Sequence, residues 1–144
     1  LKNTGMAVTT DITHLTDIHP KNKQDVGKRL ALWALANTYG KKGLVYSGPV
    51  YKSMKVEGNK IRLTFDHVGG GLKSRDGKPL SWFTLAGKEG EVVEGTAVID
   101  GNSVVVSSDK IAEPAAVRFG WDQLAEPNLM NAESLPASPF RTSR

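Results

Sequence analysis

The stretch that decides the fold reads Asp11-Ile-Thr-His-Leu-Thr-Asp17-Ile-His19-Pro20, followed directly by Lys21-Asn-Lys-Gln-Asp-Val-Gly-Lys-Arg-Leu30. It places two acids and a histidine in a short loop between an apolar run and a helix-like segment. Residues 6–10 are apolar and β-branched, which predicts a buried strand that ends at Asp11. Strand, loop and amphipathic helix in this order are typical of an α/β protein.

The segment after the loop predicts a helix from about Lys23 to Thr38. Asn22 is a suitable N-cap, and Asp25 meets the free N–H groups and the positive dipole end of the first turn. Gly40 is expected to end the helix. Spacing of i, i+4 and i+7 predicts an apolar stripe made of Val26, Leu30, Trp33 and Ala34, with Asn37 one turn on and Ala31 and Leu35 at its margin.

After Gly43 the pattern changes to short alternating runs separated by turn signals. The predicted strands are residues 50–56, 60–65, 80–85, 92–99, 103–107 and 115–121, with hairpins around residues 57–60 and 100–102. Such spacing predicts an antiparallel sandwich or sheet. The tail from Asp122 is rich in Pro, Asn and Ser, so it must gain order by packing on another part of the protein.

We therefore expect a chain of mixed α/β and all-β class. Residues 1–47 would be the last piece of an α/β domain, and residues 48–144 a small β-sandwich-like domain with an irregular tail. The boundary is placed near residues 47–49. The first residues resemble neither a start of translation nor a signal peptide, so we expect a fragment or a processed piece.

Composition excludes several classes of protein. The 144 residues contain no cysteine, which rules out disulfides and thiolate metal sites. The apolar runs are too short to span a bilayer. The net charge of +4 is concentrated between Lys21 and Lys42, where six basic residues accompany one acid. No aromatic platform is interleaved with these charges, so a solvated helix face is favoured over nucleic-acid binding.

The loop sequence Asp17-Ile-His19-Pro20 has a catalytic and a structural interpretation. In the first, a neutral imidazole takes the proton of a serine and returns it to the leaving alcohol, while the carboxylate on its other nitrogen fixes the tautomer. In the second, the acid and the histidine only cap the loop or lie on the surface. The residue pattern by itself leaves both open.

Other polar and aromatic residues carry weaker signals. A metal site built from His14, His19 and His67 lacks helical i, i+4 spacing, so neither a metal nor a cofactor is expected. The glycines at 69–71 are not followed by the Lys-Ser/Thr of a phosphate cradle. Trp82, Trp121 and Phe140 could stack on a sugar, but in a small β domain they are more often core residues.

Longer motifs carry a resemblance to a family. They are Gly5-Met-Ala-Val-Thr-Thr-Asp11, Asp17-Ile-His-Pro-Lys-Asn-Lys-Gln-Asp-Val-Gly-Lys-Arg-Leu-Ala31, Gly48-Pro-Val-Tyr-Lys-Ser-Met54, Phe65-Asp-His-Val-Gly69, Asp76-Gly-Lys-Pro-Leu80, Arg118-Phe-Gly-Trp121, Pro127-Asn-Leu129 and Leu135-Pro-Ala-Ser-Pro-Phe-Arg-Thr142. Over nearly the whole chain, this set resembles the C-terminal portion of bacterial sialate O-acetylesterase-like carbohydrate esterases, which belong to the SGNH (GDSL-type) hydrolase group.

The resemblance implies a flavodoxin-like α/β/α domain for the first part and hydrolysis of O-acetyl esters on sugars by a Ser-His-(Asp) mechanism. His19 matches the catalytic histidine of the family. Many relatives carry the acid three residues before the histidine, but position 16 is Thr, so Asp17 is the first choice and Asp11 the alternative. The nucleophilic serine and the oxyanion residues have no counterpart here, and the isolated chain is expected to be inactive.

The expected partners are an O-acetylated sugar or polysaccharide and the N-terminal remainder of the same enzyme. Neither nucleic acid nor a membrane span is expected, and the full-length protein should be periplasmic or secreted. Residues 6–10 and the helix should expose apolar faces, so the chain alone is expected to associate. The alternative function is a non-catalytic β module that binds carbohydrate or a protein, in which Trp82 and Trp121 would be exposed and His19 incidental.

Overall fold

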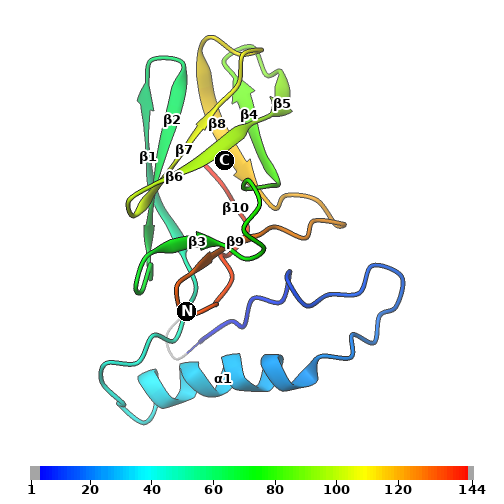
Figure 1. Ribbon diagram of the computed structural model, residues 1–144, viewed down its shortest axis with the longest axis vertical. Coiled ribbons are helices and arrows are strands. Elements are labelled where there is room, and N and C mark those ends of the chain that lie inside the picture. Colours follow the sequence, from blue (N-terminus) through cyan, green and yellow to red (C-terminus); the bar gives the residue numbers. More distant parts are fainter. Residues whose placement is uncertain (1–3, 143–144) are drawn as a thin grey trace.

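The computed structural model describes residues 4–142, in which one helix is followed by ten strands (Figure 1). The helix and the segment before it lie at one end of the molecule, and the strands fill the rest. The elements are α1 (Lys23–Asn37), β1 (Val50–Glu57), β2 (Lys60–Asp66), β3 (Leu72–Ser74), β4 (Phe83–Gly87), β5 (Val92–Glu94), β6 (Thr96–Asp100), β7 (Ser103–Ser107), β8 (Pro114–Phe119), β9 (Leu129–Asn131) and β10 (Phe140–Arg141).

Helix α1 begins and ends where its sequence signals lie. The Asn22 side chain accepts a hydrogen bond from the Asp25 amide at 3.1 Å, which satisfies one of the free N–H groups of the first turn. At the other end Gly40 has a positive φ of 65°, and the Lys41 amide bonds to the carbonyl of Leu35. The predicted helix is therefore confirmed to within one residue.

The predicted apolar stripe of α1 is only partly correct. Val26 and Trp33 are half-buried, whereas Leu30 and Leu35 are exposed. The buried residue of the helix is Arg29, on the same face as Val26 and Trp33. This face turns toward the segment that precedes the helix, and that segment supplies polar partners for a guanidinium.

The predicted strand at residues 6–10 is not formed. A strand is defined by ladder hydrogen bonds to a neighbour, and no strand of residues 4–142 pairs with this segment. Residues 7–10 are half-buried and Met6 is exposed, and the segment is irregular. The predicted burial is only partly found, and an apolar, β-branched composition cannot supply the pairing partner that a strand needs.

The strands form two four-stranded antiparallel sheets and one small pair. The first sheet has the order β1-β2-β7-β6, the second β10-β8-β4-β5, and β3 pairs with β9. The predicted hairpins are confirmed: β1 pairs with β2, and β6 with β7. The fold is thus one helix followed by antiparallel sheets, and it is mostly β.

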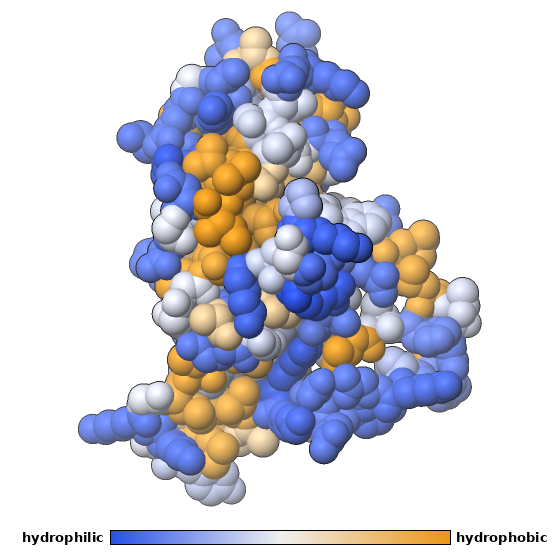
Figure 2. All heavy atoms as spheres, in the orientation of Figure 1, coloured by the Kyte–Doolittle hydropathy of each residue, from blue (hydrophilic) through white to orange (hydrophobic). Residues whose placement is uncertain are grey.

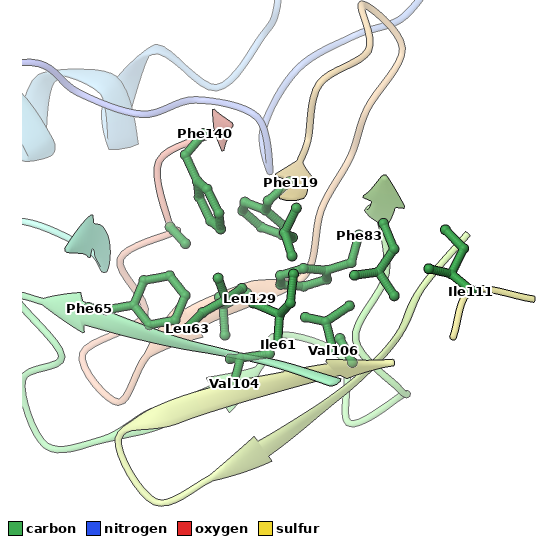
Figure 3. Packing of buried hydrophobic residues seen from close by; sticks show 14 residues of the cluster. Ile61, Leu63, Phe65, Phe83, Val104, Val106, Ile111, Phe119, Leu129 and Phe140 are labelled. Carbon is green, nitrogen blue, oxygen red and sulfur yellow. The ribbon is translucent and has the colours of Figure 1, made fainter. Parts of the chain in front are cut away.

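The core lies between the two large sheets (Figure 3). Alternate residues of β2 and β7 point inward from one side, and those of β4, β8 and β10 from the other. The rings of Phe83 and Phe119 lie 4.6 Å apart, and those of Phe119 and Phe140 lie 5.6 Å apart. Phe140 is therefore a core residue, as its residue type indicated.

The predicted strand 92–99 is divided between the two sheets. Its first half, β5, pairs with β4, and its second half, β6, pairs with β7. Gly95 lies at the crossing, where a Cβ would come within 2.7 Å of Val106. Alternation alone does not distinguish one continuous strand from two that change sheets at a glycine.

The tail is ordered by buried amide side chains, which confirms that it packs on the rest of the protein. Asn131 is fully buried, and its Nδ2 donates to the carbonyls of Ser47 and His67 at 3.0 and 3.2 Å. Its Oδ1 accepts from the Leu135 amide at 2.9 Å. The same residue thus connects the tail to the segment that joins α1 to β1.

Candidate active-site loop

Loop 11–20 is attached to the rest of the protein through Asp11. Both oxygens of this carboxylate accept hydrogen bonds from the Arg29 guanidinium, at 2.7 and 2.6 Å. Arg29 also donates to the carbonyl of Val8 at 2.6 Å, so one guanidinium binds two positions of the segment that precedes α1. Arg75, which directly follows β3, donates to the backbone carbonyl of Asp11 at 3.0 Å. The loop is therefore fixed at its start to α1 and to the segment after β3.

Asp17 and His19 form a local pair at the far end of the loop. Oδ1 of Asp17 lies 3.2 Å from Nδ1 of His19 and accepts the His19 backbone N–H at 2.8 Å. The two side chains are 44% and 81% exposed. A carboxylate at Nδ1 favours the tautomer with the proton on that nitrogen and leaves Nε2 able to accept one. Nε2 has no hydrogen bond within residues 4–142.

The two candidate acids have different surroundings. The Asp11 side chain is 7% exposed and is bound at both oxygens by Arg29, with no hydrogen bond to His19 in the part of the chain described. The Asp17 carboxylate contacts the imidazole directly. The geometry therefore favours Asp17 over Asp11 as the partner of His19, and gives Asp11 the role of holding the loop.

The other two histidines, His14 and His67, contact different residues and not the Asp17–His19 pair. His14 Nδ1 is 3.4 Å from the Thr16 hydroxyl. The His67 ring packs edge-on against Tyr46, with centroids 5.1 Å apart. Within residues 4–142, no group of three or more His, Asp or Glu side chains is arranged to hold a metal ion. The same residues include no helix long and apolar enough to cross a membrane.

Trp82 and Trp121 are 41% and 53% exposed, so neither belongs to the core. Core packing was the favoured sequence interpretation for both, and it is wrong. The reason is their position: Trp82 precedes the core residue Phe83, and Trp121 follows the turn at Gly120 that ends β8. The Gly120 amide bonds to the Trp82 carbonyl at 2.9 Å.

Two residues that support the loop were not singled out from the sequence. Arg29 is one of the six basic residues between Lys21 and Lys42 for which a solvated helix face was favoured, and Arg75 lies in none of the predicted strands or hairpins. A signal for Arg29 did exist, because it lies three residues after Val26 and four before Trp33, on the face that is half-buried. Arg75 carries no such signal, because its contact joins residues far apart in the sequence.

The chain is similar in sequence to known esterases. No family model matches the chain. Residues of the chain are 38% identical over 72 positions to the sialate O-acetylesterase of Mus musculus and 37% identical over 71 positions to that of Homo sapiens. The chain is homologous to part of the sialate O-acetylesterases. The match covers 46% of the chain and 13% of the mouse protein, and 45% of the chain and 14% of the human protein.

A solved acetylesterase structure extends the match along the chain. The crystal structure of a carbohydrate acetylesterase from Xanthomonas citri superposes with a TM-score of 0.88 at 48% identity. The superposition covers 92% of this chain and 31% of the acetylesterase. The resemblance to these esterases noted in the sequence is thereby confirmed. The chain spans about a third of that structure and a smaller share of the curated sialate O-acetylesterases.

Proposed function

We propose that this chain is the C-terminal portion of a carbohydrate O-acetylesterase and that it supplies the general base of the active site. The observation that carries the proposal is the contact of 3.2 Å between Nδ1 of His19 and Oδ1 of Asp17, in a loop fixed at its start by Arg29. This contact leaves Nε2 of His19 to face a nucleophile. The partial homology to sialate O-acetylesterases supports the same assignment.

In the proposed reaction, a serine from outside this chain attacks the acetyl carbonyl while His19 Nε2 takes the serine proton. His19 then gives that proton to the sugar oxygen as the ester C–O bond breaks. Water attacks the acetyl-serine in the second half, again with His19 as base. Asp17 keeps the imidazole in the required tautomer and stabilises its protonated form.

The proposal also assigns the surroundings of the chain. Residues 1–47 would complete a flavodoxin-like α/β/α domain, in which the irregular segment 6–10 pairs with a strand from the N-terminal remainder of the enzyme. Residues 48–144 would form the β-sandwich-like domain that follows. Leu30 and Leu35, which are exposed on α1, would be covered by that remainder. Figure 2 shows apolar surface at the end of the molecule where Figure 1 places the helix. The complete protein would be periplasmic or secreted and act on O-acetylated sugars or polysaccharides.

The test uses the complete protein that contains this chain, with acetylated sugars as substrates. His19→Ala should lower kcat at least about 10³-fold, because the general base is lost. Asp17→Asn should lower kcat by about 10²-fold or more with KM little changed, because it disturbs the tautomer and leaves binding intact. The matched control is His14→Ala, which removes an exposed histidine of the same loop.

Two results would contradict the assignment of His19 as the general base. One is full activity of the His19→Ala variant. The other is equal loss of activity in the His14→Ala variant, which would point to loop disruption and not to a base. The chain of 144 residues, purified alone, should show no esterase activity.

A second candidate function is supported by the exposure of Trp82 and Trp121. Exposed indoles can stack on sugar rings, so the strands could form a carbohydrate-binding module in which His19 has no catalytic role. Binding of saccharide by the complete protein that persists without any ester hydrolysis would favour this second function.

A further inference from the structure

The face of sheet β10-β8-β4-β5 that points away from the core carries two arginines side by side. Phe83, Phe119 and Phe140 point inward, so the next residues along these strands point outward. Arg118 is paired in register with Arg141 on one side and with Thr84 on the other. Like charges directly opposite each other in antiparallel strands destabilise a sheet.

Neither arginine is neutralised by an acid. Within residues 4–142, no salt bridge or hydrogen bond is made by the side chain of Arg118 or of Arg141, and Nε of Arg118 is buried without a partner. The other large sheet shows the contrast. There the outward guanidinium of Arg62 pairs with Glu57 and with Asp100, at 3.0 and 2.7 Å.

Aromatic surface adjoins this unpaired charge. The Cζ atom of Arg141 lies 5.3 Å from the centroid of the Trp121 ring, which remains half-exposed. Beside it is a shallow depression lined by Gly120, Trp121, Asp122, Gln123 and Pro139, in which Oδ1 of Asp122 accepts the Leu124 amide at 2.7 Å. Trp82 lies next to Gly120, whose amide donates to the Trp82 carbonyl. The φ of Trp82 is positive, at 63°, a conformation that a bulky residue rarely adopts and that is typical of functional positions.

We propose that this face binds a saccharide that carries a carboxylate. The guanidinium of Arg141, with Arg118 on the neighbouring strand, would form charge-assisted hydrogen bonds to the carboxylate. The indole of Trp121 would stack against the sugar ring, and Gln123 offers an amide for its hydroxyl groups. The site does not depend on His19 or on ester hydrolysis.

Calorimetric titration with trigalacturonate tests the proposal, with galactotriose of the same linkage as the neutral counterpart. The two ligands offer the same rings for stacking and differ in the carboxylates. Trigalacturonate should bind at least about ten-fold more tightly, and its affinity should fall as salt is raised. Binding should be seen both with the 144-residue chain and with the complete protein.

Single-residue variants test which side chains contact the saccharide. Arg141→Gln should lower the affinity for trigalacturonate at least about ten-fold and leave the affinity for the neutral trisaccharide unchanged. Trp121→Ala should lower the affinity for both ligands. Arg141 is exposed, so its replacement does not endanger folding. The controls are Lys52→Gln and Tyr39→Ala, which remove an exposed cation and an exposed aromatic residue elsewhere.

Each of four outcomes would overturn the proposal: equal affinity for both trisaccharides, no binding at millimolar concentration, an unchanged affinity of Arg141→Gln, or equal affinity for inorganic sulfate. The last would identify a simple anion site. Binding by the isolated chain that is absent from the complete protein would show that this face is covered by another part of the enzyme, and would also overturn the proposal. Loss of esterase activity without loss of this binding would affect only the proposed function.

Discussion

The carboxylate of Asp11 is bound at both oxygens by the guanidinium of Arg29, and this pair is nearly buried between loop 11–20 and helix α1. Breaking a buried ion pair leaves the other charge without a partner in a poorly solvated site. Arg29→Met or Asp11→Asn should therefore lower the free energy of unfolding by about 3–5 kcal/mol. Urea denaturation of each variant measures the loss.

The control for the Arg29 variant is Lys28→Met, in the preceding position of the same helix. Lys28 is exposed and pairs with Asp25 at 3.3 Å, so its loss should change stability by less than about 1 kcal/mol. Equal stability of Arg29→Met and the wild type would show that the pair does not hold the loop.

Asn131 is the second buried polar residue whose removal should be costly. Asn131→Ala leaves the carbonyls of Ser47 and His67 and the amide of Leu135 without their partner. The expected destabilisation is about 3 kcal/mol, from the desolvation of buried unpaired groups. Asn131→Asp should destabilise the protein more than Asn131→Ala, because a carboxylate would face two carbonyl oxygens. Thermal unfolding measures both, and Asn102→Ala in an exposed turn should stay within about 0.5 kcal/mol of the wild type.

The stability of the protein should depend on pH through Asp76. Hydrogen bonds from the Asn128 amide, and then from the Ser74 hydroxyl, lower the pKa of Asp76 from 3.8 to about 2. A lowered pKa in the folded state stabilises the fold above pH 3.8, and this contribution is lost as the pH falls toward about 2. The stability gap between wild type and Asp76→Asn should therefore be widest at neutral pH and close between pH 4 and 2.

Carbon NMR titration of the Asp76 carboxyl provides the direct measurement. In Asn128→Ala the largest cause of the shift is removed, so the pKa of Asp76 should rise toward 3.8. A stability gap that is the same at pH 7 and at pH 2 would contradict the assigned cause.

Two glycines should respond to alanine in opposite directions. At Gly48 a Cβ would overlap the carbonyl oxygen of Pro136, and the backbone of the tail would have to move. Gly48→Ala should cost at least about 1–3 kcal/mol. Gly27 lies in α1 with no atom within 4 Å of its Cβ position, so Gly27→Ala should stabilise the protein by about 0.5–1 kcal/mol. Thermal unfolding of the two variants checks both signs.

The isolated chain should associate through the exposed apolar residues of α1. Leu30 and Leu35 are 50% and 36% exposed on neighbouring turns. Burial of such surface drives association, so sedimentation should show larger species as concentration rises. The double variant Leu30→Gln with Leu35→Gln should shift the chain toward monomer, whereas Val98→Thr, on an exposed strand face, should not. A wild-type chain that is monomeric at all concentrations would contradict this prediction.

Much of the fold could be predicted because its signals are local. The N-cap at Asn22, the positive φ of Gly40 and the two hairpin turns each depend on residues close together in the sequence. The Asp17–His19 contact is of the same kind, since the two residues are two positions apart. Strands β3, β9 and β10 were missed because each has only two or three residues, too few to produce an alternating pattern.

By itself, then, the sequence determined the helix and its caps, the hairpins, the candidate base and the partial homology to acetylesterases. The tertiary structure decided what depends on distant partners. It placed Arg29 and Arg75 on the Asp11 end of the loop, split one predicted strand at Gly95, and left residues 6–10 without a strand to pair with. It also left Arg118 and Arg141 unpaired beside Trp121. The physical reason is that charge neutralisation, ladder pairing and burial are properties of groups brought together by folding, and the order of residues along the chain does not state which groups will meet.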